Sequence, residues 1–432
     1  MTSPTYHAMN AVARPLALER VSLVDGTGAK PIHGATVLVR DGVIRAVLSP
    51  GEAEHLGAEY LRIRLDGSWL MPGLINCHDH LMNKSLAQQP SGSSANVSVR
   101  AWRTGLFLRS PGFQALESAR NAQAQLAQGV TTVRELSGPA VKDTNEPGYT
   151  NVDLRDAIAG GLSGPRVLAC RLAVAMTGGH GFPWYALRQA DGPHEVRKAV
   201  REQIRGGADF IKIMASGGLS NYPKERPDTI EYSVEELSVA REEAHRSHRR
   251  ITAHAIADQA IRNCIAAGID TIEHGFLASE ESVRQMADAG TSFVPTVSVI
   301  LRASTGESEL AALAQSLVKS HRSAVKLAQS LGIDIGVGTD SRATMVEEMA
   351  NLVEEYHLPP LVVITAATAV AARICGLTDV GVVAPEKRAD LLLIGQDPVA
   401  NLREALQDVR AVVKNGRLVV AEQALFKGGP CA

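Results

Sequence analysis

Between residues 70 and 341 the chain repeats one pattern, a short apolar segment followed by a longer stretch with helical periodicity. The apolar segments are LMPGLINCHDH (70–80), VTTVREL (130–136), RVLACRLAV (166–174), FIKIMASGG (210–218), ITAHAI (251–256), TIEHG (271–275), SFVPTV (292–297) and IGVGTDS (335–341). Eight strand–helix units over roughly 310 residues are typical of a (β/α)8 barrel. We therefore predict an α/β fold with a TIM-barrel domain over residues 71–384.

The two ends of the chain have a different pattern of apolar and polar residues. Residues 14–70 alternate apolar and polar positions, interrupted by Asp41-Gly42 and Asp66-Gly67. These pairs suit hairpin turns, because glycine accepts the positive φ that such turns require. The same alternation is found over residues 385–428, where Asn415-Gly416 is a third hairpin signal. We predict one small β-sandwich domain formed from 14–70 and 385–428.

The composition argues against nucleic-acid and membrane partners. A formal net charge of −2 over 432 residues gives neither of them an electrostatic attraction. Five scattered cysteines without a CxxC pair are typical of a reducing compartment. The chain shows no signal peptide and no uncharged apolar run approaching about 18 residues. We expect a cytoplasmic protein without a membrane span.

Ionisable side chains stand at the ends of several predicted strands. The first strand ends in His-Asp-His at 78–80, and residues two apart on a strand share a face, so both imidazoles point the same way. Such a pair can chelate zinc or a similar ion. His254, His274 and Asp340 end three further strands. A single strand-end histidine is more often a hydrogen-bonded core residue, but the coincidence of four histidines and one aspartate favours a metal site.

Lys212 lies inside the apolar strand FIKIMASGG. A buried ammonium is unfavourable unless it is paired or neutralised, and burial lowers the pKa of lysine. The neutral amine can react with CO2 to give a carbamate, an anion able to bridge two metals. The alternative is an ion pair with an acidic neighbour such as Glu135 or Asp209.

Together these side chains predict two adjacent sites for divalent ions, with zinc the favoured metal. His78, His80 and Asp340 serve one ion, His254 and His274 serve the other, and carbamylated Lys212 lies between. Two such ions lower the pKa of a bridging water and polarise a carbonyl group. The expected chemistry is hydrolysis of an amide-like bond by the resulting hydroxide.

These segments resemble the amidohydrolase superfamily, most closely its prolidase-like and Xaa-Arg-type dipeptidases and ochratoxin-hydrolysing enzymes. The resemblance covers nearly the whole chain and rests on PGLINCHDH, GVTTVREL, TGGHG, FIKIMASGG, AHA, IEHG, GTDS and RADLLLIGQDP. It implies the metal roles given above, a proton transfer by Asp340 from the attacking hydroxide to the leaving amine, and a homo-oligomer. Asn76 departs from the aspartate that is frequent in the family, and Glu135 departs in the same way.

The resemblance also implies which residues contact the substrate. His180, in TGGHG, would contact the scissile carbonyl oxygen or its developing oxyanion. Tyr222 matches by position a second hydrogen-bond donor to the same region.

Other residues near these segments have two interpretations each. The aromatic cluster Phe182, Trp184 and Tyr185 forms either an apolar substrate pocket or a plug that packs the loop. Lys224 and Arg226 either bind a substrate carboxylate or are solvated loop charges.

The long segment 83–110 after the first strand is either a lid over the site or a tolerated surface insertion. Ser233 and Glu236 stand at capping-box spacing and start a predicted helix. The histidines without a strand-end context, His321 among them, are expected at the surface.

The sequence thus predicts a metal-dependent hydrolase that releases an amino acid from a small-molecule amide, a dipeptide or an N-acyl amino acid. Attack on a carbamate, urea or cyclic amide is the alternative within enzymes. A non-catalytic binding barrel is the alternative from another class, but it would be expected to lack some of the six ligands.

Overall fold

The computed structural model describes residues 15–82, 109–138, 151–182, 185–341 and 343–421. The chain divides into two compact units, one within Met1–Ile75, Gln123–Thr132 and Leu352–Ala432 and the other within Asn76–Ala122 and Val133–Asn351. The segment expected as a lid, 83–110, lies outside the described residues apart from its last two positions.

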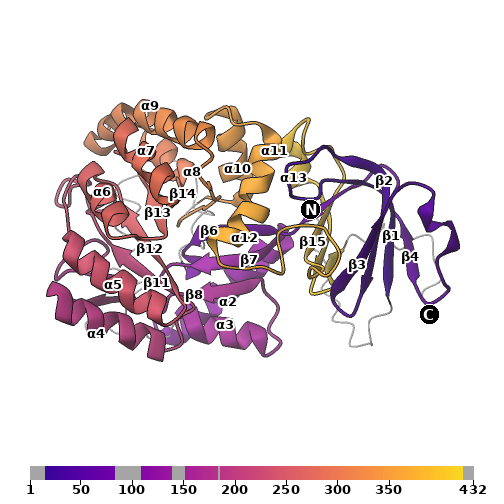
Figure 1. Cartoon of the computed structure of the whole chain (residues 1–432), viewed down its shortest axis with the longest axis horizontal. Helices are drawn as coiled ribbons and strands as arrows, with labels where there is room; N and C mark the ends of the chain where they lie inside the picture. The colour runs from indigo at the N-terminus through magenta and orange to yellow at the C-terminus, as the bar shows by residue number, and fades with distance from the viewer. Residues whose placement is uncertain (1–14, 83–108, 139–150, 183–184, 342, 422–432) are drawn as a thin grey trace. The chain divides into compact units, whose positions relative to one another are not determined.

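Strands from both chain ends form one eight-stranded sheet (Figure 1). They are β1 (Leu16–Leu23), β2 (Ile32–Arg40), β3 (Val43–Leu48), β4 (Leu61–Arg64), β5 (Trp69–Pro72), β15 (Leu391–Ile394), β16 (Val409–Lys414) and β17 (Arg417–Ala421). Antiparallel pairing of β15 with β5 joins the two ends, with Leu392 opposite Met71. Val37, Ile44 and Leu391 belong to the buried core of this domain. The bounds 14–70, 385–428 and 71–384 stay a prediction.

Two of the three predicted hairpin turns are confirmed. Asp41 and Gly42 join β2 to β3 with φ of 53° and 78°, and Asn415 and Gly416 join β16 to β17 with φ of 49° and 73°. The third prediction, at 66–67, is wrong. Strands β4 and β5 pair in parallel with successive parts of β1, so the chain advances along β1 instead of folding back.

The barrel strands lie mostly in the other unit, although the first residues of two of them, at 74–75 and 130–132, belong to the unit described above. They are β6 (Leu74–Asp79), β7 (Val130–Glu135), β8 (Arg166–Ala169), β9 (Ala173–Ala175), β10 (Leu187–Gln189), β11 (Phe210–Met214), β12 (Arg250–Ala255), β13 (Thr271–His274) and β14 (Ser292–Val294). Neighbouring strands from β11 to β14 are parallel. The fold class is the predicted one, a TIM barrel with a small β-sandwich domain built from both chain ends.

The eighth predicted barrel strand, 335–341, is not a regular strand. It makes only isolated bridges, yet it occupies the expected place between β14 and β6. The Gly336 N–H donates to the Phe293 carbonyl, and the Cys77 N–H donates to the Val337 carbonyl, each at 2.8 Å. The segment therefore connects β14 to β6 and carries Asp340 to the carboxyl end of the barrel strands.

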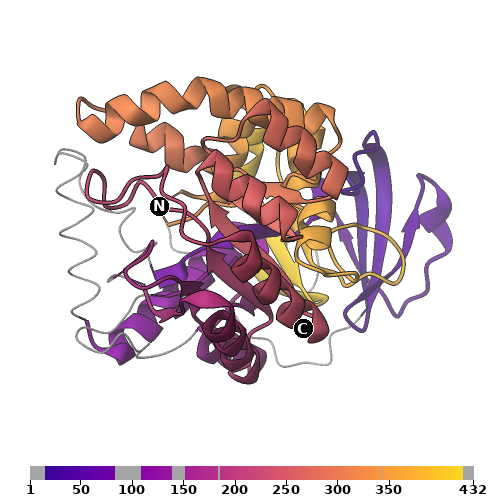
Figure 2. The ribbon, with the colours of Figure 1, turned by 60° about the vertical axis from the view of Figure 1, so that its left-hand side comes forward.

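The helices are α2 (Pro111–Ala127), α3 (Asn151–Ala159), α4 (Gly192–Arg205), α5 (Val234–Arg246), α6 (Asp258–Ala266), α7 (Glu280–Ala289), α8 (Val297–Ala303), α9 (Glu309–Ser330), α10 (Met345–Glu354), α11 (Pro360–Ala366), α12 (Ala369–Ile374) and α13 (Leu402–Gln407). Helices α4 to α7 lie outside strands β11 to β14 (Figures 1 and 2). Helix α4 buries Val196, Ala199 and Val200 at helical spacing, which explains this layer. The predicted capping box of Ser233 and Glu236 starts α5.

Among the described helices, none combines the length and the apolar character needed to cross a bilayer.

Candidate active site and metal centre

Seven of the eight predicted site residues line a single pocket. They are His78, His80, His180, Lys212, His254, His274 and Asp340. Most stand at or near the carboxyl ends of β6, β11, β12 and β13, or in the segment after β14 that replaces the eighth strand. Because parallel barrel strands end on the same face, residues far apart in sequence meet there.

The predicted ligands of the first metal lie close together. The candidate ligand atoms of His78, His80 and Asp340 are all within 4.8 Å of one another, and His80 Nε2 is 3.7 Å from Asp340 Oδ1. The predicted ligands of the second metal adjoin them. The ring centroids of His274 and His78 are 4.8 Å apart, and those of His254 and His274 are 4.6 Å apart.

Each of these four imidazoles has one nitrogen held by the protein, which leaves the other for a metal. Nδ1 is held in three of them, by Glu273 Oε2 for His78 (2.7 Å), the Ser137 carbonyl for His80 (2.7 Å) and Thr296 Oγ1 for His274 (2.8 Å). In His254 the held atom is Nε2, which donates to the Gly217 carbonyl at 3.2 Å. Such outer contacts fix the orientation of ligand histidines. Burial lowers the pKa of His80 to about 3 and lowers those of His254 and His274 well below the ordinary value, which favours the neutral form that binds metals.

Lys212 is buried on β11, and its Nζ has no hydrogen-bond partner among the described residues. The predicted alternative, an ion pair with Glu135 or Asp209, is absent from those residues. Asp209 instead accepts from Arg155 at 2.8 Å, and Glu135 accepts from the Leu81 N–H at 2.8 Å. Burial lowers the pKa of Lys212 to about 8. An amine without a hydrogen-bond partner beside the predicted metal ligands fits the predicted two-metal centre.

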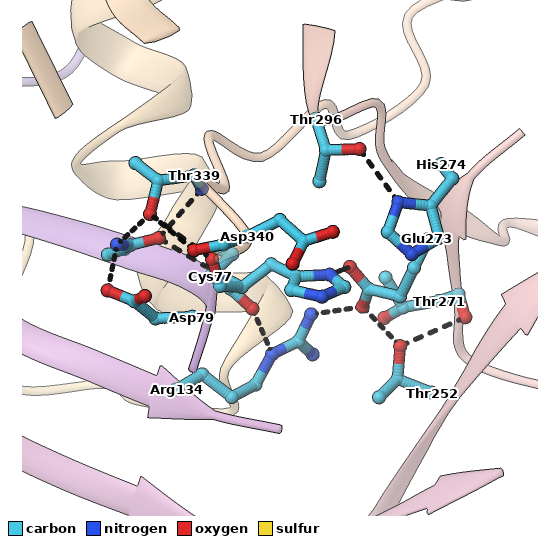
Figure 3. Close-up of polar contacts among 12 residues, drawn as sticks. Cys77, Asp79, Arg134, Thr252, Thr271, Glu273, His274, Thr296, Thr339 and Asp340 are labelled. Carbon is cyan, nitrogen blue, oxygen red and sulfur yellow. Dashed lines mark hydrogen bonds and ion pairs between the residues drawn. The ribbon is translucent and has the colours of Figure 1, made fainter. Parts of the chain in front are cut away.

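Glu273 supports the site and was not predicted. Its buried carboxylate accepts from His78 Nδ1. It also accepts from Arg134 Nη2 at 2.5 Å and from the Thr252 hydroxyl (Figure 3). Arg134 Nε also donates to the Cys77 carbonyl at 2.6 Å. Although burial opposes it, Arg134 and His78 hold the pKa of Glu273 below its ordinary value. The available signal was a second ionisable residue inside the apolar strand TIEHG.

Asn76 shows how the protein accommodates its departure from the family pattern. Its Nδ2 donates to Asp79 Oδ2 and to Thr339 Oγ1, each at 2.8 Å. Asp79 also accepts from the His80 N–H at 2.8 Å. The amide at position 76 supplies a donor that an ionised aspartate would lack, and Asp79 is not among the residues lining the pocket.

The two predicted oxyanion contacts differ in their placement. His180 lines the pocket, and its ring is stacked on His254 with centroids 4.0 Å apart. Tyr222 lies in the loop after β11, is half-buried and is not among the lining residues. Its hydrogen bond to the substrate stays a prediction.

The remainder of the pocket wall is mainly apolar. Its apolar and aromatic members are Tyr185, Met214, Leu219, Ile256, Phe276 and Val299. Of the predicted aromatic cluster, Tyr185 packs against His80 with centroids 5.0 Å apart, Phe182 is 38% exposed and outside the lining, and Trp184 falls outside the described residues.

The candidate carboxylate-binding residues Lys224 and Arg226 are exposed, and Arg226 is paired with Asp228 at 3.0 and 3.1 Å. These positions match the predicted alternative of solvated loop charges.

The amidohydrolase family model matches residues 69–419, so the chain belongs to this family. It is a hydrolase of carbon–nitrogen bonds of the amide type.

The chain is similar to three other proteins over most of its length. Ochratoxinase from Aspergillus niger is 30% identical over 480 residues, covering 96% of this chain and 91% of that protein. A solved Xaa-Pro dipeptidase with bound methionine has a TM-score of 0.78 and 25% identity, covering 94% of this chain and 100% of its own. Imidazolonepropionase from Ralstonia nicotianae is 28% identical over 423 residues, covering 91% of this chain and 94% of that protein.

Proposed function

We propose that the chain is a binuclear metal-dependent hydrolase that cleaves the amide bond of a dipeptide or an N-acyl amino acid. The observation that carries this proposal is the buried, unpaired Nζ of Lys212 in a pocket lined by four histidines and an aspartate. Burying an amine without a hydrogen-bond partner is unfavourable, which favours a functional role for Lys212.

The proposed ligand sets follow the strands. His78, His80 and Asp340 would hold one divalent ion, His254 and His274 the other, and modified Lys212 would contribute to both. When bound, two such ions lower the pKa of a water molecule and polarise a carbonyl group. Zinc is the favoured metal, because imidazole nitrogen suits it well.

The modification of Lys212 is the addition of its amine to CO2. Its neutral amine forms an N–C bond to CO2, one carbon–oxygen π bond opens, and one proton is released to give the carbamate anion. A pKa lowered to about 8 makes the neutral amine available near neutral pH.

The protein's own groups have distinct roles in this proposal. The Asp340 carboxylate accepts a proton from the attacking water and delivers it to the leaving amine nitrogen. His180 stabilises the scissile carbonyl oxygen as charge develops on it, with Tyr222 as the predicted second donor. The apolar wall around Phe276 and Ile256 excludes water from one side of the substrate and favours an apolar substituent there.

Two relatives support an amide between an acyl or aminoacyl group and an amino acid, since they are named ochratoxinase and Xaa-Pro dipeptidase. The similarity to a protein named imidazolonepropionase supports the alternative of a cyclic amide substrate. Cytoplasmic location and homo-oligomerisation stay predictions from the sequence.

A substrate panel tests the proposal. Protein loaded with Zn2+ or Mn2+ is incubated with N-acyl amino acids, dipeptides, cyclic amides, aryl carbamates and ureas, and the released amine is quantified. We expect turnover of N-acyl amino acids or dipeptides. Turnover confined to cyclic amides, carbamates or ureas would reject the proposed substrate class, and metal content near zero after growth in supplemented medium would support a non-catalytic barrel.

A further inference from the structure

The imidazole of His180 is held on several sides. Its Nδ1 is hydrogen-bonded to Glu225 Oε1, and its backbone N–H donates to Glu231 Oε1 at 2.8 Å. One ring face stacks on His254, with an interplanar angle of 21°. A ring fixed at both its backbone and its Nδ1 edge cannot turn without breaking these contacts.

The contacts of Glu225 define the direction of its bond to His180. The same Oε1 also accepts from the Gly218 N–H at 2.7 Å, so this oxygen acts as an acceptor. The proton in the pair therefore sits on Nδ1 of His180, and Nε2 is the ring nitrogen left for the pocket.

The loop backbone also approaches the ring closely. A Cβ placed on Gly218 would lie 2.2 Å from His180 Cε1, a distance that no side chain can occupy. Gly218 and Glu225 thus lie at the two ends of one short loop segment, and both contact the same imidazole. The hydrogen bond between the Gly218 N–H and Glu225 would close this loop without any contact to His180. The additional contacts to the imidazole therefore indicate that the loop also holds the ring.

We propose that Glu225 is a positioning residue that fixes the orientation of His180 toward the scissile carbonyl group. The inference rests on the proposed function, in which His180 contacts the substrate. Contacts that orient metal-binding histidines typically contribute about 10- to 100-fold to activity, and we expect an effect of the same order for His180.

A double-mutant cycle tests this role on the metal-loaded enzyme. Glu225→Ala is expected to lower kcat about 10- to 100-fold, with KM and metal content nearly unchanged. In a His180→Ala background the same substitution is expected to cause no further loss. Glu225→Gln keeps an acceptor oxygen at the same reach and should retain most of the activity. Glu235→Gln, at an exposed position in the first turn of α5, is the matched control.

Equal losses from Glu225→Ala in both backgrounds would overturn the proposal, because they would show that Glu225 acts on the loop and not through His180. Unchanged kcat in Glu225→Ala would overturn it as well. If the alanine variant does not fold, Glu225→Asp replaces it, since it keeps the charge but shortens the side chain by one methylene.

A spectroscopic signature separates this inference from the proposed function. In protein labelled with 15N-histidine, an Nδ1 proton that is hydrogen-bonded to a carboxylate and protected from solvent gives a downfield 1H resonance. We expect a signal of this kind that disappears in both His180→Ala and Glu225→Ala, while the signal expected from His78 Nδ1 and Glu273 remains in both variants. The signal without turnover of any amide would contradict only the proposed function. Turnover without the signal would contradict the role of Glu225.

Discussion

Glu273 Oε2 lies 2.7 Å from His78 Nδ1, and Oε1 of the same carboxylate lies 2.5 Å from Arg134 Nη2. All three side chains are buried. One carboxylate therefore neutralises a buried guanidinium and orients a predicted metal ligand at the same time. This links the stability of the barrel to its metal affinity.

Glu273→Gln should weaken both properties. The substitution removes the charged partner that Glu273 supplies to the buried Arg134 guanidinium, which costs about 3 kcal/mol of unfolding free energy. Loss of the carboxylate behind His78 should lower metal affinity about 10- to 100-fold. Urea unfolding and competition with a chromophoric chelator measure the two effects. Unchanged metal affinity, with Glu235→Gln as the control, would contradict the orienting role.

Gly218→Ala should impair catalysis without removing metal. Its methyl group would collide with the imidazole of His180, and a displacement of about 1 Å can lower the rate about 100-fold. The steady-state kcat and the metal content of the purified variant measure this. Gly112→Ala is the matched control, because a Cβ there meets nothing within 4 Å. A kcat equal to that of the wild type would show that His180 tolerates displacement.

His321 was expected at the surface, and this prediction is wrong. The residue is fully buried on α9, and its Nε2 donates to the His274 carbonyl at 3.0 Å. Burial lowers its pKa to about 3, so it stays neutral. This bond satisfies the backbone where His274 adopts φ of 72°.

His321→Phe keeps an aromatic ring but removes the donor to that carbonyl. We expect a loss of about 1–3 kcal/mol of unfolding free energy, because a buried acceptor loses its partner. Urea denaturation measures it, with the exposed His194→Phe as the control. Equal stabilities of the two variants would contradict this account.

Glu348 should make stability depend on pH. Its buried carboxylate accepts from the backbone N–H groups of Val297 and Ser298 at 2.6 and 2.8 Å, and burial raises its pKa from 4.5 to about 7. Because the folded state binds the proton more tightly, the contribution of Glu348 is fully present below pH 4.5. It is lost as the pH rises through 7, by up to about 3 kcal/mol.

The comparison with Glu348→Gln isolates this effect. The variant loses one acceptor at every pH, so its stability is offset by a constant amount, but it cannot titrate at this position. Between pH 4.5 and 8 the wild type should lose unfolding free energy relative to the variant. A difference that does not change with pH would show that the pKa of Glu348 is not raised.

Lys212→Ala should lose metal and activity, because the proposed carbamate bridge is then absent. Short carboxylic acids such as acetate should restore part of both, since they fit the space of the missing side chain and supply a carboxylate. Metal analysis and amide turnover with and without acetate measure this. Full activity of the variant without acetate would contradict the bridging role.

Much of the site was predictable because barrel topology converts strand ends into neighbours. His78, His254 and Asp340 are far apart in sequence, but the eight-fold repeat alone was enough to place them on one face. Lys212 could also be predicted as a site residue, because it is a charged residue in an otherwise apolar strand.

The residues that support the site were not predictable in this way. Glu225, Glu348 and His321 stand in a loop and in two helices, where charged and polar residues are ordinary on a solvent-exposed face. The partners named above are backbone groups or side chains 45 to 51 residues away in sequence. The exception is Gly218, which is close in sequence to its partner Glu225. The hairpin error at 66–67 has a similar cause, because a turn signal reports local geometry and not the strand against which the chain then pairs.

The most direct test of the binuclear account is a metal titration of amide hydrolysis. Metal-stripped protein is titrated with Zn2+ or Mn2+, and hydrolysis of the best N-acyl amino acid or dipeptide is followed. We predict baseline activity without metal and a plateau at about two equivalents per chain. Full hydrolysis by the metal-stripped protein, or a plateau at about one equivalent, would contradict the account.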